Sequence, residues 1–160
     1  MLLTGTFKRS VDEKQRIAIP KKLRSAFLDT TKATTETASK SNTKAGLFIA
    51  PGTDGSLAIY TEESFSRLAE KLSDGSPTGQ DRRAFSRMFY ARAQRVEMDG
   101  QGRVRIDPEL VKLAGLQSEC VLVGVGDRLE LWDASRWEKY QAEQQAKFDE
   151  LAEGAFRSDG

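Results

Sequence analysis

Short apolar segments separated by polar turns alternate with stretches of helical spacing, and the same order occurs twice along the chain. Alternating polar and apolar positions favour half-buried strands, whereas apolar residues three or four positions apart favour helices. In the first half we expect strands at 5–11, 16–19, 47–50 and 57–60, and helices at 21–28 and after Thr61. A further helix is expected at 80–92. In the second half we expect strands at 93–98, 103–106, 120–125 and 129–132, and helices opened by Pro108 and by Asp133.

A sequence repeat underlies this order. The segment Asp12-Glu-Lys-Gln-Arg16-Ile-Ala-Ile-Pro20-Lys-Lys-Leu23 returns as Asp99-Gly-Gln-Gly-Arg103-Val-Arg-Ile-Asp107-Pro-Glu-Leu110, with a constant offset of 87 residues. Further along, Leu57-Ala-Ile-Tyr60 followed by Phe65 resembles Leu129-Glu-Leu-Trp132 followed by Trp137. We expect Phe65, Trp132 and Trp137 to belong to the core. The repeat predicts an α+β fold built from two tandem, pseudo-symmetric modules.

The composition changes twice outside the repeated segments. Residues 29–46 are almost all small and polar, so they offer little to bury and predict a flexible loop. Beyond about residue 145 the last helix becomes acidic, and we expect its end to fray. The expected domains are therefore a first module at 1–77, a second at 78–145 and an acidic tail at 146–160.

Basic residues concentrate around the two repeated segments. The chain carries a formal net charge of only +1, yet residues 1–25 hold seven basic and two acidic side chains. Residues 78–105 hold seven basic and three acidic side chains, and residues 127–160 hold five basic and nine acidic ones. Basic surface beside an acidic tail is typical of proteins that bind a polyanion. A solvated charged face would explain the same distribution.

The residue types that most enzymes and metal sites need are scarce. The chain has no histidine, which removes the usual general base near neutral pH and the commonest metal ligand. Its single cysteine, Cys120, lies in an apolar run and predicts a buried side chain in a reducing compartment. We therefore expect no catalytic residues, no metal, no cofactor and no small-molecule substrate.

Nothing in the sequence predicts a membrane or a secreted protein. No apolar run approaches the roughly 20 residues that a membrane helix needs. Residues 1–8 lack the basic start and long apolar centre of a secretion signal. A cytoplasmic protein is expected.

The repeated segment has the chemistry of a nucleic-acid contact. If Ile17 and Ile19 face the core, Arg16 faces outward and Lys14 lies at the tip of the turn. A two-stranded ribbon fits the major groove of DNA, where arginine bonds a guanine edge or a phosphate. Alternatively, an ion pair between Asp12 and Arg16 only fixes the turn. The second copy offers Gln101, Arg103 and Arg105, and the preceding strand adds Lys8 and Arg9.

The paired motifs resemble the MraZ family of bacterial transcriptional regulators. The resemblance rests on Asp-x-Lys-x-Arg-Ile-x-Ile-Pro at 12–20, on Asp-x-Gln-Gly-Arg-Val-x-Ile at 99–106, and on Val123-Gly-Val-Gly-Asp-Arg-Leu-Glu-Leu-Trp132. It implies two AbrB-like β-α modules, a small β-barrel with swapped hairpins, and ring-shaped homo-oligomers. It also implies nucleoid-associated binding to repeated boxes of double-stranded DNA upstream of the cell-division and cell-wall operon, with Lys14 and Arg16 in contact with DNA.

Three departures from the family pattern modify these expectations. Gln15 stands where the family usually has glycine, so the first turn should avoid a positive φ or tolerate strain. Asp107 replaces a proline and adds negative charge, which favours DNA contact mainly through the first copy. The 29–46 segment is longer than the family loop. An alternative from another class is an antitoxin-like interaction module whose partner segment is the acidic tail at 141–160.

Overall fold

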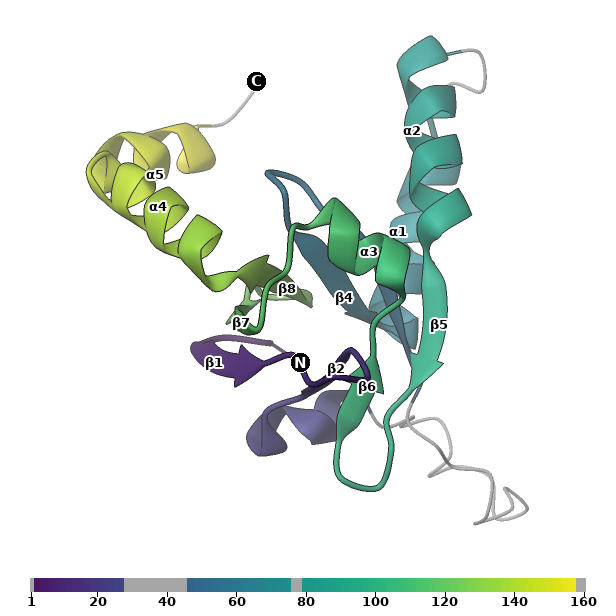
Figure 1. The fold of residues 1–160 in the computed structure, drawn as a ribbon. Helices are drawn as coiled ribbons and strands as arrows, with labels where there is room; N and C mark the ends of the chain where they lie inside the picture. The colour runs from purple at the N-terminus through teal and green to yellow at the C-terminus, as the bar shows by residue number, and fades with distance from the viewer. Residues whose placement is uncertain (1, 28–45, 76–78, 158–160) are drawn as a thin grey trace.

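The protein is an α+β structure in which the two halves of the chain share one large sheet (Figure 1). The computed structural model describes residues 2–27, 46–75 and 79–157. The strands are β1 (Thr6–Ser10), β2 (Arg16–Ala18), β3 (Gly46–Pro51), β4 (Leu57–Thr61), β5 (Gln94–Glu97), β6 (Arg103–Arg105), β7 (Glu119–Gly124) and β8 (Arg128–Asp133). The helices are η1 (Lys21–Phe27), α1 (Glu62–Ser73), α2 (Gln80–Arg92), α3 (Pro108–Leu113), α4 (Ala134–Gln145) and α5 (Phe148–Phe156).

Each expected strand is present, and the helices differ from expectation in two places. The first short helix, η1, is a 3-10 helix. The tail does not simply prolong α4, because Lys147 leaves the helical conformation at φ −127° and a separate helix, α5, follows it. The expected loop at 29–46 lies outside the described residues except for Gly46, which begins β3.

The six-stranded sheet has the order β1-β7-β8-β4-β3-β5 and is antiparallel at every junction. Strand β1 of the first half pairs with β7 of the second, and β5 of the second half pairs with β3 of the first. The registers agree with a pseudo-two-fold axis between β4 and β8, where Leu57 lies opposite Leu131 and Ile59 lies opposite Leu129. Strand exchange between the halves is therefore part of the fold, while the closed barrel implied by the resemblance stays a prediction.

The second sheet consists of β2 and β6 alone, one strand from each copy of the repeat. Ile17 lies opposite Val104, and both are buried in the main core. Ile19 and Ile106 flank the ladder and are also fully buried. These apolar positions repeat at the same 87-residue offset, which explains why both copies keep them.

The helices cover two aromatic clusters at the two ends of the large sheet. Where α1 and α2 meet the sheet, Phe65 of α1 stacks on Phe48 of β3 with ring centroids 4.1 Å apart. Under α4, Trp132 packs against Trp137 and Tyr140. The prediction that Phe65, Trp132 and Trp137 belong to the core is confirmed. Figure 1 shows α2 and the α4–α5 pair as two arms that extend from the sheet on separate sides.

Side-chain caps fix the start of both arms. Thr61 accepts a hydrogen bond from the backbone N–H of Ser64 at 2.9 Å and caps α1. Asp133 accepts one from the N–H of Arg136 and caps α4 in the same way. Among the described helices, not one has the length and apolar character needed to cross a membrane.

Candidate nucleic-acid interface

A tight turn precedes both β2 and β6, and one aspartate organises each of them. Oδ1 of Asp12 accepts hydrogen bonds from the backbone N–H groups of Lys14 (2.9 Å) and Arg16 (2.8 Å). Its Oδ2 accepts from Nε of Arg16 at 2.8 Å. Asp99 repeats all three bonds in the second turn, each at 2.9 Å. The expected Asp–Arg ion pair is therefore present in both copies, and the same aspartate holds each turn.

These bonds also set the protonation of the two carboxylates. The backbone N–H of Arg16 is the main cause that lowers the pKa of Asp12, and the guanidinium of Arg16 and the N–H of Lys14 lower it further. The pKa of Asp99 is lowered in the same way, chiefly by the backbone N–H of Arg103. Both aspartates therefore stay ionised to a lower pH than a free aspartate does.

The ion pair with aspartate uses only the Nε–H group of each arginine. Asp12 engages the Nε–H of Arg16, and Asp99 engages that of Arg103. In the part of the chain that the structure describes, no other hydrogen bond holds the terminal N–H groups of these two arginines. Each side chain is about a third exposed, so the ion pair itself adds little stability. Its effect is to hold an arginine in a defined orientation with donors left for a partner.

The turns also join the two copies to each other. Gln15 has a φ of 62° and Gly102, its counterpart in the repeat, has a φ of 77°. With this left-handed backbone, the carbonyl of Gln15 accepts a hydrogen bond from the N–H of Ile106 at 2.8 Å. The carbonyl of Gly102 accepts one from the N–H of Ile19 at 2.9 Å. Of the two outcomes expected for Gln15, the structure shows the strained one.

The β2–β6 ladder gathers arginines from both copies on one face. Because side chains alternate along a strand, the face opposite the buried Ile17–Val104 pair carries the neighbouring positions. In the register of the ladder, Arg16 lies directly opposite Arg105 and Ala18 lies opposite Arg103. We call the set Arg16, Arg103 and Arg105 the arginine face.

The arginine face places like charges next to each other. Residues directly opposite in an antiparallel pair have Cβ atoms about 4.5–5.5 Å apart, and like charges there are destabilising. Arg105 is exposed and forms no ion pair with the described residues. An anion bound on this face would relieve the repulsion.

The remaining predicted site residues fall into two groups. Lys14 and Gln101 are exposed at the tips of their turns. Lys8 and Arg9 occupy consecutive positions of β1 and so point to opposite faces of the edge strand. Lys8 is exposed, whereas Nε of Arg9 donates to the carbonyl of Ala18 at 3.0 Å. Arg9 thus ties β1 to β2, a structural role that the sequence does not reveal.

Two features near the second turn bear on its charge. Oδ2 of Asp107 accepts a hydrogen bond from Nε2 of Gln94 at 2.7 Å, so this carboxylate has a partner within the fold. Arg105 belongs to the second copy in the sequence, and only the fold brings it opposite Arg16. The signal is present in the repeat, because Arg105 corresponds to Ala18, the residue two positions after Arg16.

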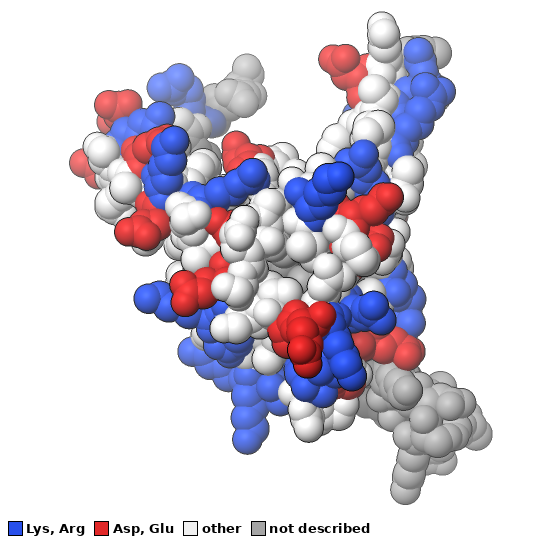
Figure 2. Space-filling model, in the orientation of Figure 1, with Lys and Arg blue, Asp and Glu red and all other residues white. Residues whose placement is uncertain are grey.

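The surface agrees with this placement. Figure 2 shows lysine and arginine side chains over the lower part of the molecule, around a smaller patch of acidic side chains, where Figure 1 places β1, η1 and the β2–β6 ladder. No cluster of acidic or cysteine side chains among the described residues has the arrangement of a metal site.

Comparison with known proteins identifies relatives along the whole chain. A family model described as "MraZ protein, putative antitoxin-like" matches twice, at residues 2–88 and 89–159. A protein of Lactiplantibacillus plantarum named "Transcriptional regulator MraZ" is 39% identical over 93% of this chain and 94% of its own length. Proteins of the same name from Corynebacterium diphtheriae (36% identical, 99% of both chains) and Mesoplasma florum (31% identical, 98% and 97%) are similar throughout.

Proposed function

The chain belongs to the MraZ family, and on this premise we propose that it is a DNA-binding transcriptional regulator that contacts DNA through its β2–β6 ladder. The observation that carries the proposal is the arginine face, to which both copies of the repeat contribute. The curated relatives support the regulatory role by name, and the geometry of the ladder supports the site.

The ladder has dimensions suited to a DNA groove. The carbonyls of Gln15 and Gly102 bond across to Ile106 and Ile19, so the two turns lie at opposite ends of the ladder. Four residue steps from Gln15 to Ile19 span about 14 Å, close to the roughly 12 Å width of the major groove. In this arrangement Lys14 and Gln101 reach the DNA at either end, and the arginines lie between them.

The fixed arginines suit both base and phosphate contacts. Arginine offers paired N–H groups that match the guanine edge or a phosphate, and such charge-assisted pairs are strong. Because Asp12 and Asp99 already orient Arg16 and Arg103, less side-chain entropy is lost when DNA binds. The first copy supplies Lys14 and Arg16, and the second supplies Arg103 and Arg105, with the neutral Gln101 at the turn position that Lys14 occupies in the first.

Oligomerisation would strengthen the weak binding of a single β2–β6 ladder to DNA. We infer that the protein forms ring-shaped homo-oligomers on the nucleoid in the cytoplasm and binds repeated boxes upstream of the cell-division and cell-wall operon. One ladder per chain binds weakly, and several tethered ladders on successive boxes raise the avidity by roughly 10²–10⁴.

The test is a binding titration of the protein on its own upstream DNA and on a scrambled duplex. Arg16→Gln keeps a donor for Asp12 but loses the charge, and we expect it to weaken binding by roughly 1–3 kcal/mol for each arginine–DNA pair that it removes. Arg67→Gln is the matched control, because Arg67 also pairs with a carboxylate four residues away (Glu63, 3.0 Å) but lies on α1. If wild type shows no preference for its own DNA, the proposed function is wrong. If Arg16→Gln binds as wild type does, the site is wrong.

A further inference from the structure

Helix α5 presents an apolar stripe that no other described part of the chain covers. Phe148, Leu151 and Phe156 are 59%, 42% and 89% exposed, although α5 packs against α4. With Ala152 and Ala155, these residues follow the spacing of one helix face. The helix also carries three acidic residues and no basic one between Phe148 and Phe156, a net charge of −3. It is an acidic amphipathic helix whose apolar side has no partner among the residues that the structure describes.

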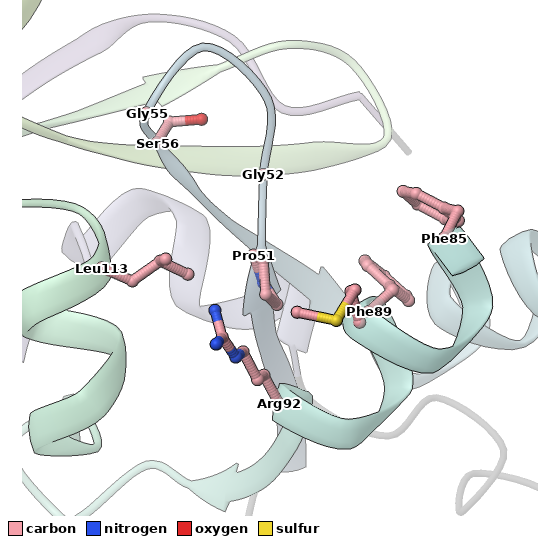
Figure 3. A pocket seen from close by; sticks show the side chains of 9 residues that line it. Pro51, Gly52, Gly55, Ser56, Phe85, Phe89, Arg92 and Leu113 are labelled. Carbon is pink, nitrogen blue, oxygen red and sulfur yellow. The ribbon is translucent and has the colours of Figure 1, made fainter. Parts of the chain in front are cut away.

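A groove of complementary character lies at the other arm of the molecule (Figure 3). It has a volume of about 320 Å³ and is formed by α2, the end of α3 and the β3–β4 turn. Phe85 and Met88 of α2 and Leu113 of α3 line it and are 46%, 56% and 42% exposed. Helix α2 carries four arginines and one aspartate, a net charge of +3.

The groove has the chemistry of a helix-docking site rather than that of a small-molecule pocket. Small-molecule pockets combine apolar walls with a few polar groups that are free to fix the orientation of the ligand. Here only Ser56 and Arg92 bring polar side chains, and the hydroxyl of Ser56 already donates to the carbonyl of Thr53 at 2.8 Å. Figure 3 shows the guanidinium of Arg92 between Leu113 and Pro51. Arg92 forms no ion pair with any residue that the structure describes, so an incoming carboxylate would find it available.

We propose that α5 of one protomer packs into this groove of a second copy of the same chain. The stripe of α5 covers Phe85, Met88 and Leu113, and its acidic residues face the arginines of α2. This inference deepens the oligomeric assembly of the proposed function, because it assigns the surfaces through which the copies meet. The mode is an amphipathic helix in a groove, with apolar anchors for affinity and opposite charges for orientation.

The interface joins two different surfaces, so it is heterologous. Figure 1 shows α2, which lines the groove, and α5 on separate sides of the sheet, so each chain can offer a groove to one neighbour and a helix to another. Such head-to-tail interfaces generate a ring when the rotation closes. The two arms are themselves related by the pseudo-two-fold axis of the sheet, with opposite charge on α2 and α5.

The decisive experiment mixes two variants of the full chain and measures masses by light scattering. Met88→Asp places a charge in the groove, and Leu151→Asp places one on the stripe. We expect each variant alone to be monomeric, because it lacks one of the two surfaces. A 1:1 mixture should form a dimer and nothing larger, since it contains one intact groove and one intact α5 per pair.

Controls separate this result from misfolding and from DNA binding. Leu2→Asp makes the same substitution at a leucine that is 79% exposed elsewhere, and it should keep the mass of wild type. Circular dichroism should be unchanged in all three variants, because the substituted side chains are exposed. The proposal is overturned if wild type is monomeric, if either variant assembles as wild type does, or if the mixture stays monomeric. The mass readout needs no DNA, so its failure is distinct from failure of the DNA-binding proposal.

Discussion

Exchanging the residue types at the two left-handed turn positions should change stability in opposite directions. Gln15 and Gly102 occupy equivalent places in the repeat and share a left-handed backbone, with φ at 62° and 77°. The carbonyl groups of both accept the hydrogen bonds that join the copies. We expect Gln15→Gly to stabilise the protein and Gly102→Gln to destabilise it.

The magnitudes follow from backbone strain and one neighbouring side chain. A left-handed backbone costs a residue with a side chain roughly 1–2 kcal/mol, and a new glycine stabilises the unfolded chain by roughly 0.4–1 kcal/mol. Gln15→Gly should therefore stabilise the fold by about 0.5–1 kcal/mol. At Gly102 a Cβ would overlap the guanidinium of Arg24, which donates to the carbonyl of Ile19 at 2.9 Å. Strain and loss of this hydrogen bond should make Gly102→Gln destabilising by about 1–2 kcal/mol.

Urea denaturation at one fixed protein concentration measures both effects, because the stability of an oligomer depends on concentration. Gly100→Gln is the matched control, since Gly100 lies in the same turn, has no positive φ and would meet nothing within 4 Å of a new Cβ. It should change stability little. A destabilised Gln15→Gly variant, or a Gly102→Gln variant as stable as wild type, would refute the role given to the left-handed backbone.

The protonation of the bridged aspartates and of the buried thiol can be tested separately. The pKa values of Asp12 and Asp99 are lowered in the fold, so their contribution to stability is present above the ordinary carboxyl value of 3.8 and is lost as the pH falls below it. An Asp12→Asn/Asp99→Asn double variant should show a flatter loss of unfolding free energy in an acid titration than wild type, and equal slopes would contradict this. Burial, with a smaller effect of the Asp133 charge, raises the pKa of the Cys120 thiol to about 11. A thiol reagent at pH 8 should therefore modify Cys120 slowly in the folded protein and rapidly in urea, and fast modification without urea would show that β7 is not packed as described.

The local elements could be predicted from the sequence because each has a local cause. Thr61 and Asp133 precede apolar residues of helical spacing, and both act as caps. The paired motif fixes the two turns through an aspartate that bonds to N–H groups two and four residues ahead. These interactions depend on neighbours in the chain, so a pattern of residues reveals them.

The arrangement between the halves depends on interactions that no single segment encodes. Strands β1 and β5 each pair with a strand of the opposite half of the chain. The two modules, which are similar in sequence, therefore share one sheet. The same exchange brings Arg105 opposite Arg16, and it turns Arg9 toward the carbonyl of Ala18. The break at Lys147 and the separate helix α5 are missed for another reason. The acidic composition of the tail predicts fraying, whereas its apolar residues are spaced for a helix that needs a partner.

The most direct test of the two-copy DNA interface is the salt dependence of binding by an Arg105→Gln variant. Removing one arginine–phosphate pair should make the plot of log affinity against log salt shallower by about 0.9. If both copies form one surface, Arg105→Gln should weaken binding and flatten this slope by about that amount, while the mass of the oligomer stays that of wild type. An affinity and slope equal to those of wild type would contradict the account, because Arg105 would then lie away from the DNA.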